Sequence, residues 1–304
     1  MATTSSTDRG ATTGSAPALL DIGEPVLRYV SCAHPGGLHR MAYWEWGRAD
    51  NPDVVVCVHG LTRTGRDFDV LASRLARRFR VVCPDVVGRG ASDRFGKPDL
   101  YTVPIYVADM VTLVARLGVE SVDWVGTSMG GIIGMVYAAT PGNPIRRLVL
   151  NDIGPEISEA GLQRIGGYVG EIPTFASFDE AERAVRQLIA DFGPLDDAQF
   201  RVLSRHYIVE RDERWTFHYD PAIAQAFHAA QASGPAAPLW PLWDAIQGPA
   251  LVVRGSRSDI LSAEVAQQMT QRGPRAQCYE VDGVGHAPSL IPDDQVAAIE
   301  RFLS

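Results

Sequence analysis

The chain has 304 residues, 46% of them hydrophobic and 21% charged, a composition typical of a globular protein with a large core. Its net charge of −8 argues against nucleic acid as a partner, because phosphate binding requires clustered Lys and Arg. No apolar run approaches the length of a membrane-spanning helix or forms a secretory signal core, so we expect a cytoplasmic protein without a membrane span.

Residues 1–18 are rich in Ser, Thr, Gly and Ala, which predicts a disordered N-terminal tail. The four cysteines lie in or beside apolar runs and show no C-x-x-C spacing. They are Cys32, Cys57, Cys83 and Cys278. This distribution favours reduced, buried thiols over a disulfide framework or a zinc site.

From residue 26 to residue 152, apolar strand patterns alternate with helical patterns at short intervals. The predicted strands are 26–30, 40–46, 53–58, 79–83, 122–126 and 147–152. The predicted helices are 67–78, 103–117 and 132–139. The first two strands are separated by Pro35-Gly36-Gly37 and predict an antiparallel hairpin at a sheet edge. The remaining alternation predicts parallel strands joined by right-handed crossovers.

This alternation stops after Asp152 and resumes near residue 250. The intervening residues show no buried strand but four helical stretches, at 158–169, 178–192, 196–206 and 221–232. Strand and helix patterns return at 250–255, 262–272, 278–281 and 292–303. We therefore predict a core domain of residues 19–152 and 246–304, with residues 153–245 inserted as a helical cap lying over the sheet.

The segment Gly126-Thr127-Ser128-Met129-Gly130 lies between an apolar strand and an apolar helix. G-x-S-x-G in this context indicates a nucleophile elbow, in which glycines keep side chains out of a crowded, strained turn. The elbow raises the Ser128 hydroxyl at the carboxyl end of the sheet. It also leaves the Met129 N–H at a helix start, where it can hold a negatively charged oxygen.

A serine nucleophile needs a histidine base and a carboxylate later in the chain. His286 follows the last predicted strand and Asp259 follows the strand before it, on the same edge of the sheet as Ser128. Asp152 also ends a strand and is the alternative acid, but the chain order Ser, acid, His favours Asp259. His59 is expected to shape the turn at Gly60, so that the Leu61 N–H joins Met129 in an oxyanion site.

The sequence gives no support for a metal or a cofactor. It contains neither H-E-x-x-H nor G-x-x-x-x-G-K-[ST], and no G-x-G-x-x-G opens a helix. In the predicted cap, aromatic side chains are candidates for lining a substrate pocket, and Arg63 beside the oxyanion turn is a candidate for attracting a substrate carboxylate. The aromatic candidates for substrate binding are Tyr168, Tyr207, Trp240 and Trp243.

Four motifs in order resemble those of the α/β-hydrolase superfamily, over about residues 25–304. They are His59-Gly60-Leu61, the loop 85–93, the elbow 126–131, and Gly283-Val284-Gly285-His286. The resemblance implies a mostly parallel sheet of about eight strands flanked by helices, with a helical cap insertion. It also implies Ser128 as nucleophile, His286 as base, Asp259 as acid, and the amides of Leu61 and Met129 as oxyanion donors.

The resemblance favours an esterase, which cleaves a small carboxylic ester or lactone through an acyl-enzyme. Serine at position 128 departs from the dehalogenases and epoxide hydrolases of the superfamily, which use an aspartate there. Two alternatives remain. Carbon-carbon bond hydrolases share the Ser-Met-Gly-Gly elbow, and some members are non-catalytic receptors for a small ligand.

Overall fold

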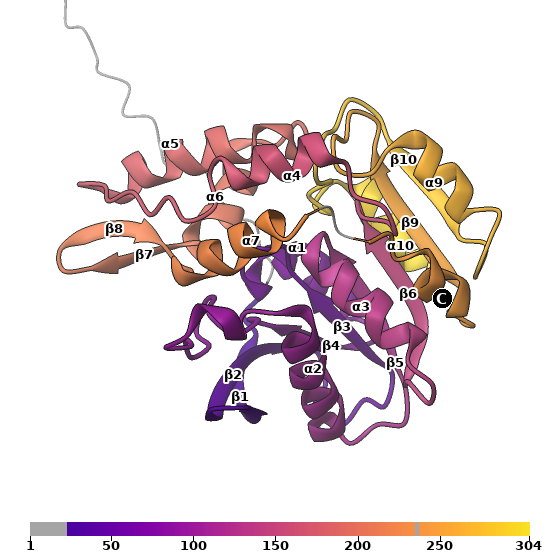
Figure 1. The fold of residues 1–304 in the computed structure, drawn as a ribbon. Coiled ribbons are helices and arrows are strands. Elements are labelled where there is room, and N and C mark those ends of the chain that lie inside the picture. Colours follow the sequence, from indigo (N-terminus) through magenta and orange to yellow (C-terminus); the bar gives the residue numbers. More distant parts are fainter. Residues whose placement is uncertain (1–22, 235–236) are drawn as a thin grey trace, which may run out of the picture.

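The computed structural model describes residues 23–234 and 237–304, so the predicted tail 1–18 lies outside the described residues. Eight strands form the central sheet in the order β1-β2-β4-β3-β5-β6-β9-β10 (Figure 1). Their bounds are Val26–His34, Gly37–Trp46, Arg80–Pro84, Val54–Val58, Val122–Thr127, Ile145–Asn151, Ala250–Gly255 and Gln277–Val281, in that spatial order.

The sheet combines an antiparallel edge with a parallel body. Strands β1 and β2 form the predicted hairpin, β2 pairs antiparallel with β4, and the pairs from β4 to β10 are parallel. The apolar run of β3 is buried at every residue, as expected for a strand covered on both faces. These pairings confirm the predicted fold class and bring the carboxyl ends of the parallel strands to one edge.

Helices cover both faces of the sheet (Figure 1). Their bounds are α1 Asp69–Leu75, α2 Val103–Leu117, α3 Met129–Ala139, α8 Trp240–Ala245, α9 Ala263–Met269 and α10 Asp293–Phe302. Helices α1 and α10 share one apolar cluster, and α2, α3, α8 and α9 contribute to a second. Helix α2 has its predicted bounds and ends at Gly118, whose φ of 69° suits a left-handed C-cap.

Residues 153–245 are here called the cap segment, and residues 153–234 of it lie along one end of the sheet (Figure 1). Their elements are α4 Glu159–Gly166, α5 Phe178–Leu188, α6 Asp197–Arg205, β7 Ile208–Arg211, β8 Arg214–Phe217 and α7 Ala222–Ala232, with α8 at the end of the segment. Side chains and backbone of the cap segment bind the loops that follow β3, β4 and β9. Residues 153–234 of the segment therefore lie over the carboxyl edge of the sheet.

The hairpin β7–β8 corrects the expectation of a purely helical insertion. Its strands are only four residues each and are joined by Asp212 and Glu213, with φ angles of 50° and 61°. Two positive φ angles define the tight hairpin turn that normally takes Asn or Gly. Because neither residue is glycine, the usual sequence signal for this turn is missing.

Two further expectations can be checked against the described residues. Cys32, Cys57 and Cys83 are buried, whereas Cys278 is exposed because β10 is the last strand of the sheet, and none of the four forms a disulfide within the described part of the chain. None of the helices in residues 23–234 and 237–304 combines the length and apolarity that crossing a bilayer would require.

Candidate active site

The turn between β5 and α3 holds Ser128 in a strained backbone conformation, with φ of 52° and ψ of −116°. A side chain at position 126 would collide with the carbonyl oxygen of Gly130, and one at position 130 would collide with that of Val58. Both glycines are therefore required by close approach of the backbone. Ser128 is left partly exposed at the carboxyl end of β5.

His286 connects Ser128 to a carboxylate. Its Nε2 lies 2.9 Å from the Ser128 hydroxyl, and its Nδ1 lies 2.8 Å from Asp152 Oδ2. Because the carboxylate only accepts, we assign the proton of the neutral imidazole to Nδ1, which leaves Nε2 free to accept the serine proton. His286 stands in the loop that follows β10, opposite the elbow.

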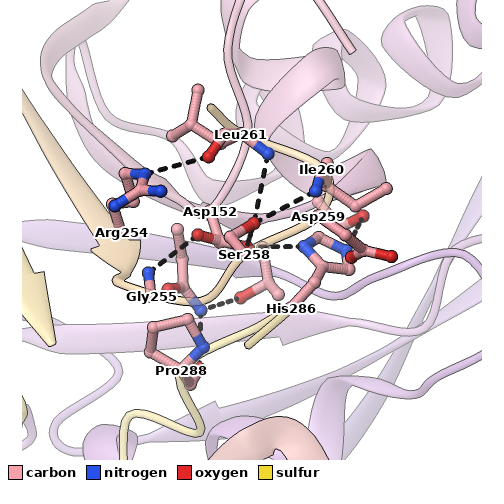
Figure 2. Close-up of polar contacts among 12 residues, drawn as sticks. Asp152, Arg254, Gly255, Ser258, Asp259, Ile260, Leu261, His286 and Pro288 are labelled. Atoms are coloured by element: carbon pink, nitrogen blue, oxygen red, sulfur yellow. Dashed lines mark hydrogen bonds and ion pairs between the residues drawn. The ribbon is translucent and has the colours of Figure 1, made fainter. Parts of the chain in front are cut away.

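The carboxylate beside His286 is that of Asp152, not that of Asp259, which corrects the choice made from chain order. Asp152 follows β6 with φ of 57°, and its side chain is fully buried. Figure 2 shows this side chain between Gly255, Ser258 and His286. The Gly255 N–H donates to Oδ1 at 2.9 Å and the Ser258 hydroxyl to Oδ2 at 2.5 Å. These donors fix the carboxylate that faces the imidazole.

Asp259 instead joins the core to the cap segment. Arg164 of α4 donates to both its carboxylate oxygens, at 2.5 and 2.9 Å, and these bonds hold the pKa of Asp259 below its usual value. The Ser158 hydroxyl donates to the backbone carbonyl of Asp259 at 2.5 Å. In the loop after β9, Ser258 therefore donates to Asp152, whereas the neighbouring Asp259 side chain accepts from Arg164.

The two expected oxyanion residues are linked by a buried arginine, Arg89, to which no sequence motif assigns a role. Arg89 Nε donates to the Leu61 carbonyl at 2.8 Å, and Nη2 lies 3.5 Å from Met129 Sδ. Arg89 is only 1% exposed and also donates to Tyr106. Met129 begins α3, so its N–H is among those without an intrahelical partner.

His59 fixes the turn next to Leu61. Its Nδ1 lies 2.7 Å from the Gly60 carbonyl, and its Nε2 accepts from the Val86 N–H at 2.9 Å. Burial lowers the pKa of His59 to about 3. The ring is therefore neutral near pH 7, and a second proton on Nε2 would meet the Val86 N–H.

We expect the free energy of unfolding to fall as pH is lowered below about 6.5. In this range the histidine binds a proton in the unfolded chain but remains neutral at position 59 of the folded protein. The folded pKa lies below the unfolded one, so the contribution is complete above pH 6.5 and is lost progressively toward about pH 3. It amounts to about 1.4 kcal/mol per pH unit. Urea unfolding at pH 7, 6 and 5 measures the slope.

The matched control for this experiment is His59→Gln, which replaces the imidazole with an amide that does not titrate. Its slope should be shallower than that of the parent; equal slopes would contradict the assignment. The comparison must be made by difference, because burial raises the pKa of nearby Asp85 to about 6 and this carboxyl acts with the opposite sign. Asp85 accepts from the Gly65 and Ala91 N–H groups, at 2.7 and 2.9 Å, and so joins its own loop to the turn after β3.

Of the residues expected to bind substrate, Tyr168 and Tyr207 lie together in the cap segment. They line a cavity of about 350 Å³ whose wall also includes Leu188, Phe217 and Tyr219. Arg63 is buried beside it, with its guanidinium carbon 4.3 Å from the centre of the Tyr207 ring. The wall is mostly apolar and aromatic, with Glu171 and Gln187 as its polar members, and a wall of this kind next to a cation suits a small amphipathic ligand.

Trp240 and Trp243 lie elsewhere, contrary to the expectation. The indole N–H of Trp243 donates to the Arg272 carbonyl at 3.1 Å, and the Arg272 guanidinium lies 4.3 Å from the ring centre of Trp240. Arg272 precedes β10, whereas His286 follows it, so both tryptophans adjoin the opposite end of that strand. Both side chains belong to an apolar core cluster, so they are packing residues of α8 and do not line the pocket.

One group of potential metal ligands occurs within the described residues, away from the elbow. Cys32 of β1, His39 of β2 and Asp109 of α2 are buried with their ligand atoms within 4.8 Å of one another. His39 Nε2 already lies 3.0 Å from Asp109 Oδ2, and burial raises the pKa of the Cys32 thiol to about 12. We interpret the group as a hydrogen-bonded cluster that ties the hairpin to α2.

The sheet order and the nucleophile elbow define the class of protein, and a family model matches most of the chain. Residues 53–292 match the family model for the alpha/beta hydrolase fold, and the chain belongs to this family.

Individual relatives narrow the chemistry. The chain is 48% identical to a 3-hydroxybutyrate-oligomer hydrolase of Cupriavidus necator, over 92% of this chain and 98% of the relative. It is 24% identical to Esterase YbfF of Escherichia coli, over 84% and 94%. The crystal structure of an alpha/beta hydrolase from Novosphingobium aromaticivorans matches with a TM-score of 0.83 and 39% identity, over 92% and 98%. The chain is a carboxylic ester hydrolase.

Proposed function

We propose that this enzyme hydrolyses esters between short hydroxy-acid units, of the kind found in 3-hydroxybutyrate oligomers, with Ser128, His286 and Asp152 as its catalytic residues. The observation that carries the proposal is the continuous hydrogen-bonded chain from the Ser128 hydroxyl through His286 to Asp152. The substrate class rests on the relative from Cupriavidus necator, which aligns with nearly the whole chain.

In the first step the Ser128 oxygen attacks the ester carbonyl carbon while His286 Nε2 takes the hydroxyl proton. The carbonyl oxygen becomes negatively charged, and the N–H groups of Leu61 and Met129 stabilise it. When the tetrahedral intermediate collapses, the bond to the alcohol oxygen breaks, and His286 returns the proton to that oxygen. Buried Asp152 orients the imidazole and stabilises its charged form throughout.

In the second step a water molecule attacks the acyl-enzyme, again losing its proton to His286. The intermediate releases the carboxylic acid and restores the Ser128 hydroxyl, so all atoms of the ester and the water are accounted for. The reaction needs no group beyond these side chains and the two backbone amides.

The cap segment supplies the remaining surface for the substrate in this proposal. We take residues 153–245 as the cap that encloses the site and residues 19–152 with 246–304 as the core. The aromatic wall at Tyr168 and Tyr207 suits the methyl-bearing carbons of a hydroxybutyrate unit. Arg164 and Asp259 hold the cap segment against the core beside this wall.

The test is hydrolysis of the 3-hydroxybutyrate dimer and trimer, followed by quantifying released 3-hydroxybutyrate. We expect release from both, and no cleavage of a ring-fission dienone, the substrate type of the carbon-carbon alternative. A fluorophosphonate probe should label Ser128 rapidly, as it would not in a receptor. If the protein cleaved p-nitrophenyl butyrate but left both oligomers intact, the substrate class would be refuted.

A further inference from the structure

Arg63 is a buried arginine with one unused nitrogen. It is 6% exposed, and its Nε and Nη2 donate to Asp67 at 2.7 and 2.6 Å. Nη2 also donates to the Leu203 carbonyl in the cap segment at 2.8 Å. Within residues 23–234 and 237–304, Nη1 is buried without any hydrogen-bond partner. A buried charged donor left unpaired is costly, so this nitrogen calls for an acceptor that a ligand would supply.

Arg63 starts beside the nucleophile turn, and its guanidinium contacts Tyr207, a residue of the cap cavity. The Arg63 N–H donates to the Gly60 carbonyl at 3.2 Å, closing the turn that carries Leu61. A Cβ built on Gly60 would lie 3.6 Å from Ser128 Cβ and 4.0 Å from Arg63 Cγ. The stem of Arg63 therefore starts beside the elbow, and its guanidinium ends over Tyr207, which lines the cavity.

Asp67 orients the guanidinium without using all of its donors. An arginine has five N–H groups, and the bidentate bond to Asp67 engages only the Nε and Nη2 edge. The two N–H groups of Nη1 belong to the edge of the guanidinium that does not contact Asp67. A planar charged group held this way is preorganised for a carboxylate oxygen.

We propose that Arg63 Nη1 binds the free carboxylate of the leaving hydroxy acid, so that the enzyme removes one unit at a time from the carboxyl end of an oligomer. The proposal rests on the proposed function and specifies the end of the substrate that is recognised. In a 3-hydroxybutyrate leaving group, three bonds separate the ester oxygen from the carboxylate carbon, a span of about 4 Å. Such a short span suits a cation whose stem begins next to the nucleophile turn.

The test compares two substrates with the same scissile bond, the 3-hydroxybutyrate dimer and its methyl ester. In the parent enzyme, kcat/KM for the free acid should exceed that for the methyl ester by about ten- to a hundredfold, the effect of one charge-assisted hydrogen bond. In Arg63→Lys this ratio should fall, because a lysine that pairs with Asp67 cannot present Nη1. In Arg63→Met/Asp67→Leu, which removes both charges, it should approach one.

Arg66 offers a matched control. It is 4% exposed, donates to Asp69 at 2.6 and 2.8 Å, and has its guanidinium carbon 4.6 Å from the centre of a Trp44 ring. Arg66→Lys should leave the acid-to-ester ratio at the parent value. Because the ratio is measured within one preparation, loss of folded protein lowers both rates and leaves the ratio unchanged.

Two outcomes would overturn the inference, and they are distinguishable. Equal kcat/KM for the acid and the methyl ester in the parent, or a ratio unaltered in both Arg63 variants, would refute the carboxylate site and leave the esterase function intact. A parent that cleaved p-nitrophenyl butyrate but neither form of the dimer would refute the hydroxy-acid substrate itself, and this inference with it.

Discussion

Replacing Ser128 with alanine is expected to lower kcat by roughly a millionfold while the fold persists. The hydroxyl is the group that His286 Nε2 contacts at 2.9 Å, and the proposed acyl-enzyme forms on its oxygen. Alanine should fit the same strained turn, because the close approach of the backbone depends on the glycines at 126 and 130 and does not depend on the serine hydroxyl. The measurement is hydrolysis of p-nitrophenyl butyrate, with a thermal unfolding curve to verify the fold.

His286→Ala should cost about as much as Ser128→Ala, and the double variant should be no slower than either single one, because the residues act as a unit. Ser233→Ala is the matched control, since this serine ends helix α7 on the exposed side of the cap segment. It should retain parent activity and fluorophosphonate labelling. Parent-like turnover by Ser128→Ala would show that another group attacks the ester.

The centre of the sheet could be predicted from sequence because strands such as β3 and β9 are buried at every residue. Runs such as Val54–Val58 have no polar face, so their pattern has few alternatives, and short alternation with helices dictates parallel pairing. The hairpin β7–β8 could not be predicted the same way. Its two short strands depend on a turn at Asp212 and Glu213, and only the tertiary structure requires the positive φ angles there.

The site was predictable to the level of loops and not of side chains. Chain position places Ser128, His286, Asp152 and Asp259 at the same edge of the sheet, because each follows a parallel strand. Which carboxylate turns toward the imidazole depends on partners distant in sequence. Arg164 of the cap segment engages Asp259, and Gly255 and Ser258 hold Asp152. No local pattern around either aspartate carries this information.

Arg89 illustrates the same limit from another direction. The loop 85–93 is one of the four motifs of the superfamily resemblance, and that resemblance assigns no role to Arg89 itself. In the folded chain Arg89 reaches the Leu61 carbonyl and the Met129 sulfur, which are brought together from separate turns. Its role as a support for the oxyanion residues exists only once those turns meet.

Asp152→Asn and Asp259→Asn should have very different effects on kcat. Asp152→Asn is expected to reduce kcat by about ten-thousandfold, because the amide can donate to His286 Nδ1 and so stabilise the tautomer that cannot accept the serine proton. Asp259→Asn should reduce kcat by less than about tenfold, because its partner is Arg164 and not the imidazole. The two variants differ from the parent by the same atoms, so the comparison isolates position.

Stability measurements complete this comparison. The Arg164–Asp259 pair has side chains 42% and 37% exposed, so its loss should cost no more than about 1 kcal/mol of unfolding free energy. Asp152 is fully buried with three donors, and its variant should be the less stable of the two. A ten-thousandfold loss of activity in Asp259→Asn, with activity kept in Asp152→Asn, would contradict this assignment. Asp259 would then be the carboxylate that pairs with His286 during catalysis, and it could do so only after breaking its bonds to Arg164.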